Sequence, residues 1–447
     1  MPEQTDNRQN GLYGSSQLPA QSGPTYDFKN SPLAKIPITG KRGRTTLAYM
    51  LDELQQKTPA QPEALDKIDR SLPAPPAAKI LARAIGSCLT HFLDFSGISK
   101  AVQESREYLL EAVCSLADEN QRQAIAACMA EFETRMIRDH KAIAEGEINA
   151  TYDNLRYLLK SEPTARSIPW QSRLLATQHF LSHAARPETL GQGSKIGSEV
   201  FCLAHKLFTT QPTRLTEMIA SVAISGEWQT FDGKTMVIDE HSLKPGPEEI
   251  LYRPGENRRS YAAKIIQVLM LNNCLRRRKR SMSYSETGGR PGKEYGGQTV
   301  RSIDGELLNP KYARISLLEL ALLAKFEFEE TGFIIINSNS FAPQTPEFAD
   351  LLSKNNLLVH VFSQEDLMET LREKKEQGML PVTIAVDERR LLAESYADGI
   401  NHCVNVVTFN EYGLLKVFNP HLLPGMQRDS RISLQRLYNS TLRSTKA

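Results

Sequence analysis

The sequence predicts an α+β protein in which a helical region precedes a region of alternating helices and strands. Apolar residues recur every three or four positions through residues 73–186, which is the period of amphipathic helices. From residue 316 onward, short apolar runs rich in β-branched and aromatic residues alternate with helical segments. The last two of these runs are separated by Phe409–Gly413, a loop of hairpin length that contains glycine.

Composition places the chain among globular proteins with a sizeable core. The 447 residues are 40% hydrophobic and carry a formal net charge of +2, so overall charge indicates neither a nucleic-acid partner nor an anionic membrane. No apolar run reaches the length of a transmembrane segment, and no Sec-type signal is recognised. Six cysteines are scattered without CxxC pairs, which is typical of reduced thiols.

Residues 1–72 are predicted to be a disordered leader. They are rich in Gln, Ser, Pro, Asn and Gly, and they have too few large apolar residues to offset the entropy of ordering. A short helix over Thr45–Gln56 is the expected exception. The composition resembles the leaders of bacterial type III effectors, so we expect secretion without a Sec signal, into a host cell, or else the bacterial cytoplasm.

Residues 73–186 are predicted to form a helical bundle domain. Its apolar stripes include Leu109, Val113 and Leu116 on one helix face. His179 and His183 are an i, i+4 pair that could in principle bind a metal. No HExxH pattern surrounds the pair, so we expect these histidines to be structural.

A glycine-punctuated loop, Gly191 to Gly197, opens the next unit, residues 187–428. It leads into a predicted helix, Ser198–Phe208, that carries Cys202, and Pro212 suits the first turn of another helix. A helix N-terminus offers partial positive charge and free N–H groups to a thiolate. This stretch is therefore the candidate site of a nucleophile.

The chain between residues 227 and 296 is predicted to hold a hairpin, a buried helix and a basic run. The hairpin spans Glu227–Asp239, and the helix spans Arg258–Asn273. The basic run, Arg276–Arg280, lacks interleaved aromatic residues, so we interpret it as a solvated helix end and expect no nucleic-acid partner. In the glycine-rich segment that follows, Glu294 comes after Lys293, which excludes a P-loop.

The later elements are predicted in the order helix, strand, helix, strand, helix and three strands. Their ranges are Ser316–Phe328, Phe333–Asn337, Thr345–Lys354, Leu357–Phe362, Ser363–Gln377, Val382–Val386, His402–Thr408 and Leu414–Phe418. Ser363 and Asp366 have the spacing of a capping box. Residues 429–447 are polar and basic, so they are predicted to be a tail.

Four features in order resemble the papain-like superfamily of cysteine proteases, with calpains the closer comparison. They are Gln192-Gly193, a helix that contains Cys202, Asn401-His402 and Asn419-Pro420, and the most specific part is NHCVNVVTFNEYGLLKVFNP. The resemblance covers about residues 190–425. It implies a helical half packed on an antiparallel sheet half, and thiol-dependent chemistry on a protein substrate, which is proteolysis, deamidation or acyl transfer of the transglutaminase kind.

The resemblance also implies a role for each of these residues. Cys202 would be the nucleophile, His402 the general base and acid, Asn419 the residue that orients the imidazole, and Gln192 an oxyanion donor. This chemistry needs no cofactor and no metal. The chain shows no EF-hand loop pattern, so calcium dependence is not expected either.

Spacing leaves two interpretations of the nucleophile open. The family places its cysteine six residues after the glutamine and two after a glycine, which corresponds to Ser198 or Glu199 in this chain. If the helix begins near Val200, Cys202 lies in its first turn and the enzyme is intact. Otherwise Cys202 is a core residue, and the protein is an inactive relative or a scaffold that binds a partner protein.

Overall fold

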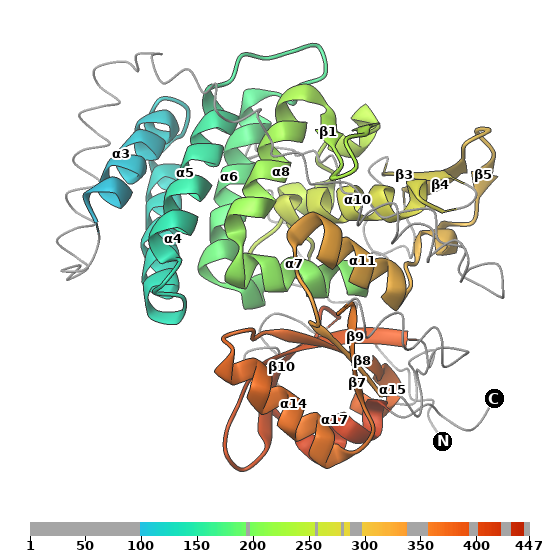
Figure 1. Ribbon diagram of the computed structural model, residues 1–447. Helices are drawn as coiled ribbons and strands as arrows, with labels where there is room; N and C mark the ends of the chain where they lie inside the picture. Colours follow the sequence, from blue (N-terminus) through green and yellow to red (C-terminus); the bar gives the residue numbers. More distant parts are fainter. Residues whose placement is uncertain are drawn as a thin grey trace, which may run out of the picture.

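The computed structural model describes residues 99–193, 197–254, 258–278, 281–286, 297–337, 356–392, 401–421 and 431–441. The predicted leader 1–72 and the helices predicted over Thr45–Gln56 and Thr345–Lys354 lie outside this part. The described chain is α+β, as predicted, with a helical region followed by mixed sheets and further helices (Figure 1). In the described part, no helix combines the length and the apolar character needed to cross a membrane.

Four helices form the first region, as the apolar periodicity predicts. They are α3 (Lys100–Cys114), α4 (Glu119–Asp139), α5 (Ala144–Lys160) and α6 (Trp170–Ala185). Ser99 caps α3, and Asp118 and Gln121 form a capping box that satisfies free N–H groups at the start of α4. Helix α3 packs on α5, and α4 packs on α6.

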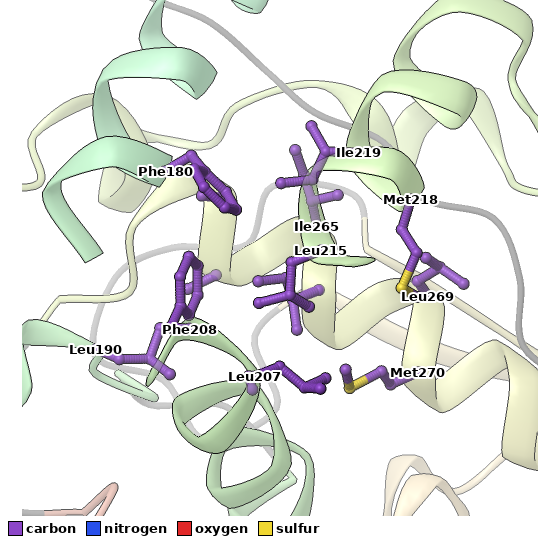
Figure 2. Packing of buried hydrophobic residues seen from close by; sticks show 14 of the residues in the cluster. Phe180, Leu190, Leu207, Phe208, Leu215, Met218, Ile219, Ile265, Leu269 and Met270 are labelled. Atoms are coloured by element: carbon purple, nitrogen blue, oxygen red, sulfur yellow. The ribbon is translucent and has the colours of Figure 1, made fainter. Parts of the chain in front are cut away.

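The middle of the chain centres on a buried helix, α10. Its elements are η2 (Pro187–Thr189), α7 (Ser198–Thr210), α8 (Pro212–Ser225), β1 (Glu227–Gln229), β2 (Thr235–Val237), η3 (Glu240–Leu243), α9 (Pro247–Ile250) and α10 (Tyr261–Arg276). Strands β1 and β2 pair as the predicted hairpin, with Gly233 at a φ of +74° in the turn. Figure 2 shows Phe180 of α6, Phe208 of α7, Leu215 of α8 and Ile265 of α10 packed together.

The basic run at the end of α10 differs from the prediction of a solvated helix end. Arg277 and Arg278 are buried, and their guanidinium groups lie 2.8 Å from Asp232 and 2.6 Å from Glu319. Guanidinium groups satisfy several acceptors at once, so these two residues tie α10 to its neighbours. Those neighbours belong to the hairpin and to α11 (Leu317–Phe328).

Two further sheets complete the chain. The smaller sheet is formed by β3 (Met282–Glu286), β4 (Gln298–Ser302) and β5 (Leu307–Leu308), and η4 (Pro310–Ala313) follows it. The larger sheet has the order β11-β10-β9-β8-β6-β7. Its strands are β6 (Ile334–Asn337), β7 (Leu358–Val361), β8 (Val382–Asp387), β9 (Asn401–Phe409), β10 (Leu414–Phe418) and β11 (Arg431–Ser433).

The large sheet is mixed, which corrects the prediction of an antiparallel half. Strand β6 is parallel to both β7 and β8, whereas β8, β9, β10 and β11 pair antiparallel. The reason is a helical crossover: α14 (Gln364–Glu376), capped by Ser363 as predicted, lies between β7 and β8 and returns the chain in the same direction.

Helices cover both faces of this sheet. Cys403 and Phe418 face a core shared with the helical regions, while Val404 and Val417 face α14 and α17 (Leu434–Thr441). Figure 1 shows α14 and α17 on the side of the sheet turned away from α7. The predicted polar tail therefore includes ordered elements, because Leu437 of α17 is fully buried against the sheet.

One continuous core extends from α3 to β10. It includes Val102, Phe208, Ile265 and Phe418, so residues on both sides of the predicted boundary at residue 186 pack together. Side chains from helices before and after this boundary contribute to the cluster shown in Figure 2. The division into a helical bundle and a papain-like domain stays a prediction.

Candidate functional site

Three strand ends meet at one edge of the large sheet. Strand β8 ends at Asp387, β9 begins at Asn401 and β10 ends at Phe418. Because β9 runs antiparallel to both neighbours, these ends lie beside one another. The candidate site is built from the residues at these three ends and from the start of α7.

His402 and Asn419 are brought together there. The Nε2 atom of His402 lies 2.9 Å from Oδ1 of Asn419, and both side chains are buried. The same Oδ1 accepts the backbone N–H of His421 at 3.0 Å. An oxygen that accepts two hydrogen bonds holds the imidazole in one orientation, which is the geometry expected for this pair. The catalytic roles of the two residues stay predictions.

Gln192 lies beside the same strand end. Its backbone N–H donates to the carbonyl of Pro420 at 3.4 Å, and its side chain is buried. The loop that carries it turns at Gly193, which has a φ of +62°. A Cβ on Gly193 would lie 3.1 Å from the backbone nitrogen of Arg259, so the positive φ and this tight contact both favour glycine. Gln192 therefore lies next to Pro420, the residue that follows Asn419 in the chain.

Cys202 lies deeper than a nucleophile at the helix N-terminus would. Helix α7 begins at Ser198, with Gly197 as its N-cap, so Cys202 is about one turn, roughly 6 Å, further along the axis. Its side chain is 0% exposed, and its thiol donates to the carbonyl of Cys403 at 3.1 Å. Burial, with a smaller contribution from the Glu199 carboxyl, raises the pKa of the thiol well above its ordinary value.

No hydrogen bond joins Cys202 to His402 among the contacts of the described residues. The interpretation in which the helix begins near Val200 is not what the structure contains, because Ser198 and Glu199 are already helical. A buried thiol with a raised pKa stays protonated, so it behaves chemically like a small apolar side chain. The proposed role of Cys202 as a nucleophile therefore has no support from its surroundings.

Glu199 occupies the first turn of α7 instead. It is buried, and burial raises the pKa of its carboxyl to about 7. A backbone hydrogen bond to the carboxyl and the nearby side chains of His421 and Arg314 partly oppose this shift. Glu199 is also the residue two positions after Gly197, which is one of the two slots that the family spacing indicates. The start of α7 therefore presents a carboxyl group rather than a thiol.

Glu388 is a member of the site that sequence reasoning missed. It is the first residue of α15 (Glu388–Leu392) and follows β8 directly. Its Oε1 atom lies 2.8 Å from Nδ1 of His421 and 3.7 Å from Nε2 of His402. Glu388 comes two residues after the predicted strand Val382–Val386, but its proximity to His402 depends on strand order, which the sequence does not reveal.

The ionisation of this group reflects its burial. Burial lowers the pKa of His402 to about 4, assisted by His421 and opposed by Glu388 and Asn419. Burial alone would raise the pKa of Glu388, but His421, His402 and Asn419 together hold it below its usual value. Near neutral pH, His402 is therefore neutral and Glu388 is ionised.

Glu388, His402 and His421 are the one cluster in the described part of the chain whose donor atoms could hold a metal ion. The helical pair His179 and His183 is engaged in hydrogen bonds within the helical region, which is the structural role expected of it. His205 hydrogen bonds with Asn405 and stacks on Phe418.

Comparisons with known protein families, with curated proteins and with solved structures find no match to this chain.

Proposed function

We propose that this chain is a papain-like protein that has lost its thiol nucleophile and acts by binding a partner protein. The observation that carries the proposal is the position of Cys202, which is one turn inside α7 and fully buried. Two contacts among the other expected site residues are consistent with the proposal, since the backbone of Gln192 bonds to Pro420 and His402 pairs with Asn419. The papain-like assignment itself rests on the sequence resemblance and on these placements.

The substitution at the nucleophile position supports the loss of thiol chemistry. Glu199 takes the first-turn position of α7, where a carboxyl group is favoured by the helix dipole. A carboxyl with a pKa of about 7 is a weak nucleophile toward a peptide carbonyl, whereas a thiolate is a strong one. The chain thus keeps the frame of a hydrolase without the group that would form an acyl-enzyme.

Exposed apolar side chains favour a binding role. Ile303 is 76% exposed in the turn between β4 and β5, and Leu307 of β5 and Tyr312 of η4 are exposed nearby in the chain. Large apolar residues grouped on a surface are typical of protein interaction sites. We infer that a partner protein, rather than a nucleic acid, contacts this part of the molecule. The composition of residues 1–72 suggests secretion into a host cell, and this remains part of the proposal.

Thiol labelling tests the proposal. Limited iodoacetamide treatment of the native protein, followed by peptide mass spectrometry, is expected to modify Cys202 no faster than Cys274 or Cys403, since all three thiols are buried. In E199C, the new thiol lies in the first turn of α7, where the helix N-terminus favours the thiolate, so it should be modified faster than Cys202, with the rate falling in the H402Q background. S198C is the matched control for a cysteine at the neighbouring position. Rapid, His402-dependent modification of Cys202 in the native protein would instead establish an intact cysteine enzyme.

A further inference from the structure

We propose that Glu388, His402 and His421 bind a divalent transition-metal ion of the zinc class. Two imidazoles and one carboxylate are a ligand set that such ions accept, with the remaining position open to water. The sequence predicted neither a metal nor Glu388, and the proposal stands apart from the loss of the nucleophile and from partner binding.

Distances between the donor atoms suit a tetrahedral ion. Zinc bonds to nitrogen and oxygen are about 2.0–2.2 Å long, so ligand atoms on a tetrahedron lie about 3.4 Å apart. The observed separations from Glu388 Oε1, 2.8 Å to His421 and 3.7 Å to His402, lie on either side of that value. All three donor atoms lie within 4.8 Å of one another. Small side-chain rotations are enough to admit the ion without moving a strand.

The three ligands are held by rigid elements. Glu388 follows β8 directly, His402 is the second residue of β9, and His421 is three residues beyond the end of β10. The two imidazole rings lie close together, with centroids 4.4 Å apart and planes inclined by 31°. A site built on adjacent strand ends is preorganised, so little conformational entropy is lost on binding.

Exposure gives the ion a route in and an open position. His402 is 3% exposed and the Glu388 side chain is 14% exposed, whereas the His421 side chain is 40% exposed. The ion would therefore bind the buried imidazole of His402, and it would enter from solvent on the side of His421. Glu199, which interacts electrostatically with His421, adds a second carboxyl near the site.

Binding exchanges existing hydrogen bonds for metal bonds. His402 Nε2 now donates to Asn419 Oδ1, and His421 Nδ1 now bonds Glu388. Each proton has to move to the other ring nitrogen before the lone pair can face the ion, and both tautomers of a neutral imidazole are uncharged. Asn419 Oδ1 keeps the backbone N–H of His421 as a partner throughout, so this oxygen is not stranded.

Isothermal titration of the full, tag-free chain with ZnCl₂ tests the proposal. We expect one Zn²⁺ per chain, and at least tenfold weaker binding in both E388Q and H421A, because each variant removes one of the three ligands. Co²⁺ should give the visible absorption of a tetrahedral site without a thiolate band. H241A removes an exposed histidine of η3 and is the matched control, with unchanged affinity expected.

Absence of Zn²⁺ binding to the native chain, or equal binding by the native chain and the E388Q/H421A double variant, overturns the proposal. Thermal melting of each variant confirms that the fold is retained, and both changed residues are at the surface edge of the site. The readout involves no thiol and no partner protein, so its failure leaves the labelling result unaffected.

Discussion

Two pairs of histidines in this protein show how differently the same side chain can be used. His179 and His183 are four residues apart on α6 and are both fully enclosed. His402, at the start of β9, and His421, just after β10, are further apart in the sequence. They meet at a sheet edge, where His421 is 40% exposed. The first pair has the spacing associated with metal sites, whereas the second has the geometry.

The difference lies in what the ring nitrogens contact. His183 bonds Thr189 through Nδ1 at 2.9 Å and Ser260 through Nε2 at 2.7 Å, and Nδ1 of His179 accepts the backbone N–H of Tyr261. These nitrogens join α6 to η2 and to the start of α10. At the sheet edge, Nε2 of His402 and Nδ1 of His421 both lie close to the carboxylate of Glu388. Sequence spacing alone therefore identifies a pair of histidines, and the hydrogen-bond partners of their ring nitrogens decide whether the pair is structural or able to bind a ligand.

Removing His183 should give the largest effect on stability. The H183A change leaves a cavity beside Phe208 and deprives the buried hydroxyls of Thr189 and Ser260 of a partner. We expect the free energy of unfolding to fall by about 2–5 kcal/mol, measured by urea denaturation. H241A, at an exposed position, should stay within about 0.5 kcal/mol of the native protein. A loss below 1 kcal/mol in H183A would show that these hydrogen bonds do not secure α6.

Acid should weaken the protein through the same buried pair. Burial lowers the pKa values of His179 and His183 from 6.5 to about 3. Below pH 6.5 the unfolded chain binds protons that the folded chain excludes, so the free energy of unfolding falls as pH decreases from 6.5 towards 3. Each histidine contributes about 1.4 kcal/mol per pH unit in that window.

The variant H183N isolates this effect, because it removes one of the titrating groups. Urea denaturation at pH 7, 6 and 5 should give a shallower loss of stability in H183N than in the native protein, by about 1.4 kcal/mol per pH unit. Parallel pH profiles for the two proteins would mean that His183 is protonated in the folded state.

Changes at the sheet-edge cluster should have the smallest effect on stability in the absence of metal. Glu388 and His421 form a partly exposed pair, so E388Q and H421A are each expected to cost less than about 1 kcal/mol by urea denaturation in the presence of EDTA. Excess ZnCl₂ should then widen the gap, because it stabilises only the native chain. A large loss in EDTA would instead make this cluster a structural element like the helical pair.

Much of the fold could be predicted because it is local. The capping box of α4, the Ser363 N-cap of α14, the hairpin β1–β2 and the strands β9 and β10 depend on neighbouring residues in the chain. The pairing of His402 with Asn419 could be predicted for the same reason, since one hairpin carries both. The buried arginines at the end of α10 could not, because their carboxylate partners come from distant segments.

By itself, the sequence determined the α+β class, the approximate boundaries of α7, α11, α14 and strands β6 to β10, and the residues that flank the candidate site. Tertiary structure decided the rest: that β6, β7 and β8 run parallel, that Cys202 is buried, and that Glu388 lies close to His402. Periodicity and capping act over a few residues and can be read along the chain. Strand order and burial depend on contacts between segments far apart in sequence, so they are fixed only when the chain packs.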